Sequence, residues 1–341
     1  MPLAQGAAAE TSSIAGHVKP QVNSCGTFCS KFYVANTGTD SILRFDFQGN
    51  GVFNVAPSNT YNLAPYLTPG WEGALAVDTN KHMYTEWFTS QHAPEILVFT
   101  DGVNGLDLFT TITGSRTGLN SAAYALALDS SNDLFAGSSN TIPIYVNEYS
   151  AADIATQNPN IAPVRTVDVG SNSENFYALA VSSSGRLYVA TDQPFYASGN
   201  QILAYKGGAS GNATPIVHIQ GANTGLCEVR GMAIDDSAYG NGRVIVSNYG
   251  HCSGTSVAQV LVFGPTSTGN VRPVATISGP DTGLKFPWGV ATDDQGDIFV
   301  ADSVANAVFK YRYDAQGDAV PLAIYQGSRT GLNAPWGLAL H

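Results

Sequence analysis

The sequence predicts an all-β protein, a six-bladed β-propeller with four-stranded blades. Three observations carry this prediction. A short apolar motif recurs six times, further strands and Gly-rich turns follow its copies, and strands near the N-terminus match those of the last repeat. Each copy begins with a small residue and continues with alternating apolar residues, and most copies end in Asp. The copies span 74–78, 125–129, 178–182, 231–235, 289–293 and 337–341. Their starts lie 48 to 58 residues apart, which is the size of a propeller blade.

The segments between the copies supply the other strands of each blade. A polar turn and a second strand follow a copy, as in Ile298–Val300, and a third strand then ends in an aromatic residue, as in Val260–Phe263. A fourth strand, such as Val274–Ile277, leads to a Gly-rich turn that recurs almost unchanged at 114–120 and 327–333. Because alternation with a period of two residues is typical of strands, these segments indicate β structure throughout.

The first blade is predicted to form from both ends of the chain. The sixth copy lies at the C-terminus, so no chain remains to complete its blade. Phe32–Asn36 matches Ile298–Asp302, and Ile42–Phe45 matches Val308–Tyr311. We therefore expect Trp336–His341 to be the inner strand of the first blade. Closing the ring in this way removes the free edges of an open sheet.

The last repeat carries a family resemblance. The block Phe286–Ser303 resembles the NHL repeat, and Ala334–Ala339 resembles the opening of another copy. The resemblance implies a single six-bladed NHL-type propeller over residues 29–341, preceded by an N-terminal extension over 1–28. Propellers of this type include binding modules, lyases and lactonases, so the function has to be argued from the site.

Composition excludes some partners. The chain has 15 Lys and Arg residues against 26 Asp and Glu residues, a formal charge of −11, and 12% of its residues are charged. A chain with so few cations cannot neutralise a phosphate backbone, so we expect no nucleic-acid binding. No apolar stretch approaches the roughly 20 residues of a membrane helix, so we expect no membrane insertion.

The four cysteines favour a secreted or periplasmic protein. They form two pairs along the chain, Cys25 with Cys29 and Cys227 with Cys252, and we expect both pairs to be disulfide-bonded. The N-terminus lacks the basic and apolar regions of a signal peptide. Because the paired cysteines nevertheless favour secretion, we expect that a signal was removed. Two alternatives stay open: a cytosolic protein with four free thiols, and metal binding by Cys25 and Cys29 with His341.

A candidate ligand site lies at one mouth of the central channel. The residue before the small residue of each inner strand should point at this mouth; these residues are Gly73, Tyr124, Tyr177, Arg230, Trp288 and Trp336, with Trp71 nearby. The residues that close the second strands should form a second, polar ring; these are Asn36, Trp87, Ser138, Thr191, Asn248 and Asp302. Aromatic walls with a few convergent polar groups are typical of ligand sites. The alternatives are that the aromatic side chains pack between blades and that Asn36 and Asp302 cap turns.

The sequence offers only weak catalytic candidates. Glu72 with Gly73 resembles the Glu-Gly pair that holds calcium in gluconolactonase-like propellers, but the other inner-strand starts supply no oxygen ligands for calcium. Glu72 with Arg230, or Glu86 with His92, could form an acid–base pair. The spacing of the histidines predicts no metal site, and no cofactor is required, although a divalent cation stays open.

Two functions follow from these observations. The first is a secreted binding or interaction module whose aromatic mouth takes a small molecule, a carbohydrate or a protein. The alternative is a lyase or lactone hydrolase that uses the same face, with or without a divalent metal. The sequence leaves the question of catalysis open.

Overall fold

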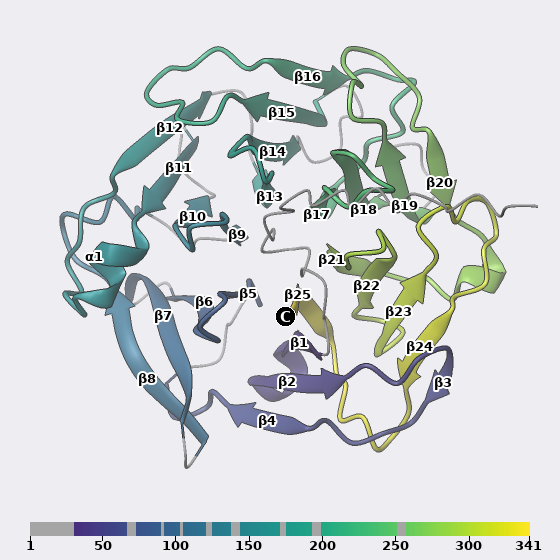
Figure 1. Cartoon of the computed structure of the whole chain (residues 1–341), viewed down its shortest axis with the longest axis horizontal. Helices are drawn as coiled ribbons and strands as arrows, with labels where there is room; N and C mark the ends of the chain where they lie inside the picture. The colour runs from purple at the N-terminus through teal and green to yellow at the C-terminus, as the bar shows by residue number, and fades with distance from the viewer. Residues whose placement is uncertain are drawn as a thin grey trace, which may run out of the picture.

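The computed structural model describes residues 31–66, 73–89, 92–102, 105–120, 125–137, 144–170, 175–192, 199–250 and 257–341. These residues form six sheets arranged as blades around a central axis, and Figure 1 shows the ring from one end of that axis. The all-β six-bladed propeller predicted from the sequence is confirmed.

Each blade has four antiparallel strands in order from the axis to the rim. The innermost strands of blades 1 to 6 are β25 (Pro335–Leu340), β5 (Ala76–Val77), β9 (Ala125–Leu128), β13 (Asn175–Val181), β17 (Val229–Asp235) and β21 (Pro287–Thr292). The second strands are β1 (Lys31–Asn36), β6 (Met83–Thr89), β10 (Leu134–Gly137), β14 (Leu187–Asp192), β18 (Arg243–Gly250) and β22 (Ile298–Asp302). The third strands are β2 (Ser41–Asp46), β7 (His92–Gly102), β11 (Ile144–Tyr149), β15 (Gln201–Tyr205), β19 (Val257–Phe263) and β23 (Ala307–Tyr311). The fourth strands are β4 (Asn59–Asn62), β8 (Gly105–Ile112), β12 (Arg165–Gly170), β16 (Val217–Gln220), β20 (Ala275–Ile277) and β24 (Ala323–Gln326).

Blade 1 combines the two ends of the described chain. Its strands are ordered β25-β1-β2-β4, so the C-terminal strand is its innermost strand, as predicted. In the register of β25 and β1, Leu340 lies opposite Phe32 and Leu338 lies opposite Val34. Each inner strand also contacts the inner strands of its two neighbours, which completes the ring.

Buried apolar side chains join the blades in pairs. The described residues contain six hydrophobic clusters, and each cluster lies between two adjacent blades. Strand β1 illustrates how one strand serves two clusters: Phe32 and Val34 pack against blade 6, whereas Tyr33 and Ala35 pack against blade 2. Since successive side chains of a strand point to opposite faces, apolar residues on both faces are what a blade between two others requires.

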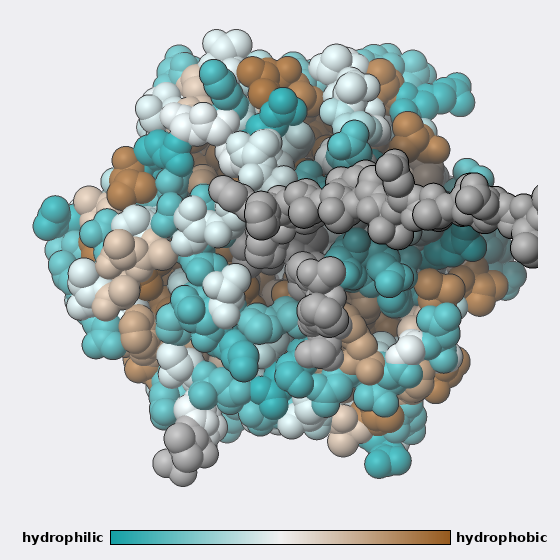
Figure 2. All heavy atoms as spheres, in the orientation of Figure 1, coloured by the Kyte–Doolittle hydropathy of each residue, from teal (hydrophilic) through white to brown (hydrophobic). Residues whose placement is uncertain are grey.

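Short segments outside the blades cover the outer strands. β3 (Gly51–Phe53) of the first repeat pairs in parallel with β24, and single bridges join Gly211, Gly269 and Gly317 to the outer strand of the preceding blade. These contacts shield edges that would otherwise be open to another chain. Figure 2 shows one face of the disc, where the visible hydrophobic residues lie mainly toward the rim.

Three short helices complete the described structure. They are α1 (Ala151–Ala155), η1 (Thr37–Thr39) and η2 (Pro280–Thr282). Helix α1, between β11 and β12, begins at the N-cap Ser150, whose Oγ accepts a hydrogen bond from the backbone N–H of Asp153 at 3.1 Å. None of the helices among the described residues has the length and apolar character needed to cross a membrane.

Candidate functional site

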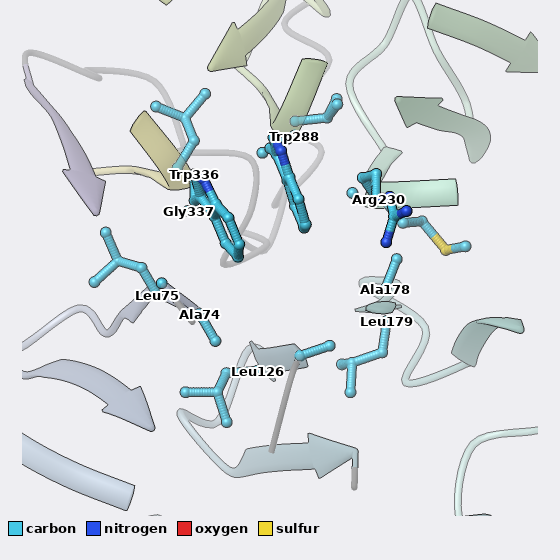
Figure 3. A pocket seen from close by; sticks show the side chains of 16 residues that line it. Ala74, Leu75, Leu126, Ala178, Leu179, Arg230, Trp288, Trp336 and Gly337 are labelled. Carbon is cyan, nitrogen blue, oxygen red and sulfur yellow. The ribbon is translucent and has the colours of Figure 1, made fainter. Parts of the chain in front are cut away.

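The mouth of the central channel is built by the first residues of the inner strands. A cavity of about 80 Å³ opens there, and Gly73, Arg230, Trp288 and Trp336 all line it. The sequence predicted these four residues at the mouth, and the structure brings them together from blades 2, 5, 6 and 1. Figure 3 shows Trp288 and Trp336 side by side, with Arg230 beyond Trp288 at the border of the same hollow.

The glycine that follows each of three mouth residues lets adjacent inner strands approach closely. A Cβ atom added at Gly231 would lie 2.1 Å from the carbonyl oxygen of Trp288, and one added at Gly289 would lie 2.4 Å from that of Trp336. A Cβ atom added at Gly337 would likewise lie 2.3 Å from the carbonyl oxygen of Gly73. No larger residue fits at these positions without displacing backbone, so the Trp-Gly dipeptides set the spacing of the tryptophans.

The two tryptophans form a parallel stack. Their ring centroids lie 3.9 Å apart with an interplanar angle of 10°. The guanidinium carbon of Arg230 lies 5.1 Å from the ring centroid of Trp288, within the range of a cation–π interaction. Phe286 stacks at 5.8 Å from Trp288, and Tyr249 lies 3.8 Å from Phe286, so the aromatic row continues outward along blades 6 and 5.

Arg230 is held in place by an ion pair. Its Nη2 lies 2.5 Å from Oε2 of Glu228, and both side chains are largely buried. Glu228 adopts a left-handed backbone conformation with φ of +50°, which is rare for a residue other than glycine, Asn or Asp. The pair directs the guanidinium toward Trp288, where it contributes a cationic group to an otherwise apolar wall.

The floor of the cavity is apolar. It consists of the residues two positions after each mouth residue along the chain; these are Leu75, Leu126, Leu179, Met232, Val290 and Leu338. Each of these residues is at most 6% exposed. Among the described residues that line the cavity, Arg230 is the only charged one.

The second, polar ring has a different role from the first. Asn36, Asn248, Asp302 and Thr191 are at most 1% exposed, and none of them lines the cavity. The carboxylate of Asp302 accepts hydrogen bonds from the backbone N–H groups of Lys285, Phe286 and Ala305 at 2.7–2.8 Å. These contacts match the turn-capping alternative.

The two amides of this ring bind backbone in the same manner. Asn248 Oδ1 accepts a hydrogen bond from the backbone N–H of Cys227 at 2.6 Å, and Asn36 Oδ1 accepts one from Asn333 at 2.7 Å. Their amide groups donate to the carbonyl oxygens of Gly225 and Gly331. The side chains therefore hold the loops that enter the inner strands, and their role in ligand binding stays a prediction.

Several predicted site residues lie outside the described structure. These are Trp71, Glu72, Tyr124 and Ser138 as whole residues, and the side chains of Trp87, His92 and Tyr177. Glu86 is described and is 1% exposed, with Oε2 3.5 Å from Oγ1 of Thr85. The proposed pairs of Glu72 with Arg230 and of Glu86 with His92 therefore stay predictions. No group of three or more possible metal ligands occurs among the described residues.

One cysteine falls within the described ranges. Cys227 is disulfide-bonded and 9% exposed. Its predicted partner Cys252 lies outside the described residues, as do Cys25 and Cys29. Both predicted pairings, and the alternative of a metal site with His341, therefore stay predictions.

The structure also shows a set of polar groups that the sequence analysis did not assign. At the far face, where the inner strands end, Asp residues bind side chains of their own blade. Lys310 Nζ lies 3.0 Å from carboxylate oxygens of both Asp293 and Asp297, and burial raises the pKa of Asp293 despite this cation. Burial, with the Asp78 carboxylate beside it, likewise raises the pKa of Tyr84. The signal was present in the Asp that recurs at the end of four of the six motif copies.

Fold and site together define a six-bladed β-propeller with an aromatic channel mouth. Residues 284–311, in blade 6, match the NHL repeat. The chain is therefore a six-bladed β-propeller that contains an NHL repeat, as the resemblance implied. No curated protein sequence matches the chain.

Solved structures show the same fold at low sequence identity. A protein from Lactobacillus plantarum is 17% identical with a TM-score of 0.55, and the match covers 93% of this chain and 89% of that one. The periplasmic gluconolactonase PpgL of Pseudomonas aeruginosa is 14% identical with a TM-score of 0.51, covering 94% and 83%. Sqt1 of Chaetomium thermophilum is 12% identical with a TM-score of 0.51, covering 88% and 71%. At these identities the likeness concerns the fold alone.

Proposed function

We propose that this propeller is a binding module that takes a small molecule at the channel mouth. The observation that carries the proposal is the stacked pair of Trp288 and Trp336 beside Arg230, over an apolar floor. A flat apolar ligand, such as an aromatic ring or the apolar face of a sugar, would stack on indole, and an anionic or hydrogen-bonding group on it would contact the guanidinium.

Trp336 is the residue that we assign to ligand stacking. Trp288 lies between Trp336 on one side and Arg230 on the other, so its ring is already engaged on both sides. Trp336 is half-buried and borders the hollow. Replacing it should therefore remove contact area from the ligand while leaving the Arg230–Glu228 pair in place.

The alternative is a lyase or lactone hydrolase, with or without a divalent metal. The fold is shared with a gluconolactonase, but fold alone does not assign an activity. Described residues at the cavity wall supply one guanidinium and neither a carboxylate nor an imidazole. The binding proposal uses groups that the described structure places at the mouth, and we therefore prefer it.

The dye 1-anilinonaphthalene-8-sulfonate tests the proposal, because it combines flat rings with an anionic group. We expect its fluorescence to rise on binding to the folded protein with one site per chain. Trp336→Ala should weaken binding roughly five- to tenfold, since an aromatic contact contributes about 1 kcal/mol beyond buried area. Arg230→Gln should weaken it as well. Competition by glucose or by indole then identifies the class of ligand.

Tyr239→Ala is the matched control. Tyr239 lies in the loop between β17 and β18 at the far face and is 60% exposed. Its ring centroid lies 4.8 Å from that of Tyr313, with the two rings tilted by 33°. Its replacement should leave dye binding unchanged. Equal affinity in the wild type and the Trp336→Ala variant would contradict the assignment of the mouth.

We also propose that the protein works in an oxidising compartment, either secreted or periplasmic. The disulfide-bonded state of Cys227 supports this, because disulfides persist mainly outside the reducing cytosol. Mass spectrometry of unreduced, denatured protein after treatment with an alkylating agent should show no added mass. Modification of all four cysteines would contradict the proposal.

A further inference from the structure

The far face of the ring carries a repeated carboxylate that blade 4 lacks. In each of blades 2 to 6, one residue at the end of the repeated apolar motif leads into the turn to the second strand; in blades 2, 3, 4 and 6 it follows the last pair of the inner strand, and in blade 5 it forms that pair with Arg243. In four blades this residue is Asp, and in blade 4 it is Ser182; the four are Asp78, Asp129, Asp235 and Asp293. Each Asp accepts backbone hydrogen bonds within its turn; for example, Asp78 Oδ1 accepts from Asn80 and His82 at 2.8 Å.

In Asp78, Asp235 and Asp293 the second carboxylate oxygen binds side chains of the same blade. In blade 2, Asp78 Oδ2 lies 2.7 Å from Nδ1 of His82 and accepts a hydrogen bond from the Tyr84 hydroxyl at 3.2 Å. In blade 5, Oδ2 of Asp235 accepts hydrogen bonds from Nη2 of Arg243 at 2.5 Å and from its Nε at 3.2 Å. The carboxylate thus has a cationic or imidazole partner in blades 2, 5 and 6, and in blade 2 it also binds a tyrosine hydroxyl.

Blade 4 keeps both kinds of partner but not the carboxylate. In blade 2 Ala76 and Val77 pair with Tyr84 and Met83, and in blade 4 Ala180 and Val181 pair with Tyr188 and Leu187. By this register Ser182 corresponds to Asp78, Arg186 to His82, and Tyr188 to Tyr84.

The short side chain of Ser182 forms no hydrogen bond with the guanidinium of Arg186 or the hydroxyl of Tyr188. Its Oγ accepts a hydrogen bond from the backbone N–H of Arg186 at 3.0 Å and contacts Oγ of Ser184 at 2.9 Å. Within the described residues, neither the Arg186 guanidinium nor the Tyr188 hydroxyl has a hydrogen-bond or ion-pair partner. Arg186 therefore lacks the carboxylate that its counterpart Arg243 binds in the next blade.

A cavity of about 270 Å³ lies at this position, lined by residues of blades 4 and 5. Ser182, Ser184, Arg186, Tyr188, Asn241 and Asp236 line it. Of the described residues that line it, Arg186 and Asp236 are charged, and Oδ2 of Asp236 already accepts a hydrogen bond from the backbone N–H of Ser183 at 2.6 Å. The volume is close to the lower end of the roughly 300–1,000 Å³ of small-molecule sites.

We propose that this cavity binds the carboxylate of a small organic acid, which takes the place of the Asp side chain that blade 4 lacks. The guanidinium of Arg186 forms the ion pair, and the hydroxyls of Tyr188 and Ser182 or Ser184 donate hydrogen bonds to the carboxylate oxygens. Charge-assisted hydrogen bonds of this kind are stronger than neutral ones. The site is separate from the channel mouth, at the opposite end of β13.

Sodium acetate is the probe for this site, with sodium chloride as the salt reference at constant ionic strength and pH 7.5. A ligand that binds only the folded state raises the Tm, so acetate should raise the Tm of the wild type above that in chloride by a few degrees at saturation. Arg186→Gln should abolish this difference. Ser182→Asp should abolish it too, because the new side chain supplies the carboxylate, and it should raise the Tm in chloride.

Arg272→Gln is the control for a general effect of losing a surface cation, since Arg272 is exposed in the loop before β20. This variant should respond to acetate as the wild type does. A wild type that acetate does not stabilise, or an acetate effect that persists in Arg186→Gln and Ser182→Asp, would overturn the proposal. Stabilisation by inorganic phosphate without stabilisation by acetate would overturn the assignment to carboxylates.

Discussion

At the mouth, single glycine residues decide which side chains meet. Gly289 follows Trp288 and leaves room for the carbonyl oxygen of Trp336, 2.4 Å from where a Cβ atom would lie. The oxygen of Trp288 in turn accepts a hydrogen bond from Ser247 and lies against Gly231. The backbones of three blades therefore approach closely at one level, and this brings the two indole rings into a stack beside Arg230.

His341 gives a residue-scale prediction for the dependence of stability on pH. Its ring lies 6.4 Å from that of Tyr33, and burial lowers its pKa below the ordinary 6.5, although Asp78 and a backbone contact with Thr79 oppose the shift. As the pH falls below 6.5, the unfolded chain takes up a proton that the folded state resists, so folding stability is lost. We expect the Tm of the wild type to fall more between pH 7.5 and pH 5.5 than that of His341→Gln.

The interval from pH 7.5 to pH 8.5 is the control for this prediction, because His341 is neutral there in both states. The wild type and His341→Gln should show parallel Tm changes in that interval. If the two proteins also changed in parallel down to pH 5.5, His341 would not contribute to acid sensitivity.

At the scale of elements, the Gly-rich turns form the same hydrogen bonds to neighbouring loops at two places in the ring. In the turn at 114–120 the Thr117 hydroxyl donates to the carbonyl oxygen of Gly114 at 2.9 Å, and Asn160 Oδ1 accepts a hydrogen bond from the backbone N–H of Arg116. In the turn at 327–333 Thr330 and Asn54 make the corresponding bonds. Gly114 and Gly327 have φ of +115° and +116°, so a side chain would be strained there as well as blocked by the Asn. The Thr bonds are local to each turn, whereas the bonds to Asn160 and Asn54 join each turn to a loop of the next blade. The recurring sequence of the turn therefore reflects packing as well as local conformation.

The C-terminal strand is the element on which ring closure depends. β25 pairs with β1 and contacts the inner strands of blades 2 and 6. Deleting residues 334–341 should open the ring and expose the two clusters that join blade 1 to its neighbours, which contain Leu338, Leu340 and Ala339. We expect a large loss of Tm, or no folded protein at all.

Circular dichroism with thermal unfolding measures this effect. A Gly-Ser extension after His341 is the control, because it keeps β25 and should leave the Tm within a degree or two of the wild type. A truncated chain that kept the wild-type Tm would contradict the role of β25 in closing the ring.

At the scale of the whole molecule, the low charge follows from the architecture. Blades are apolar on both faces because each packs between two others, so only turns, loops and the rim remain for charged residues. Several of the described acids form ion pairs, either within one blade, as Asp235 does with Arg243, or between blades, as Asp101 does with Arg44. The net charge of −11 is therefore a property of the surface rather than a feature of one site.

Most of the fold could be predicted from the sequence, whereas only part of the candidate site could. The mouth positions of Arg230, Trp288 and Trp336 were predicted, since the repeat register places them at equivalent points of three blades. The repeat register could not tell whether the side chains of Asn248 and Asp302 contact a ligand or cap loops. That distinction depends on where the loops before the inner strands run, and the repeat does not encode it.

The sequence by itself determined the number of blades, the order of their strands and the closure of blade 1 by both ends of the chain. It could do so because alternation with a period of two, turn residues and repeat length are local features that recur six times. Only the tertiary structure decided that Trp288 stacks on Trp336 next to Arg230, and that Arg186 and Tyr188 meet a cavity instead of a carboxylate. Those contacts join residues from different strands and blades, so they depend on how closely the backbones pack.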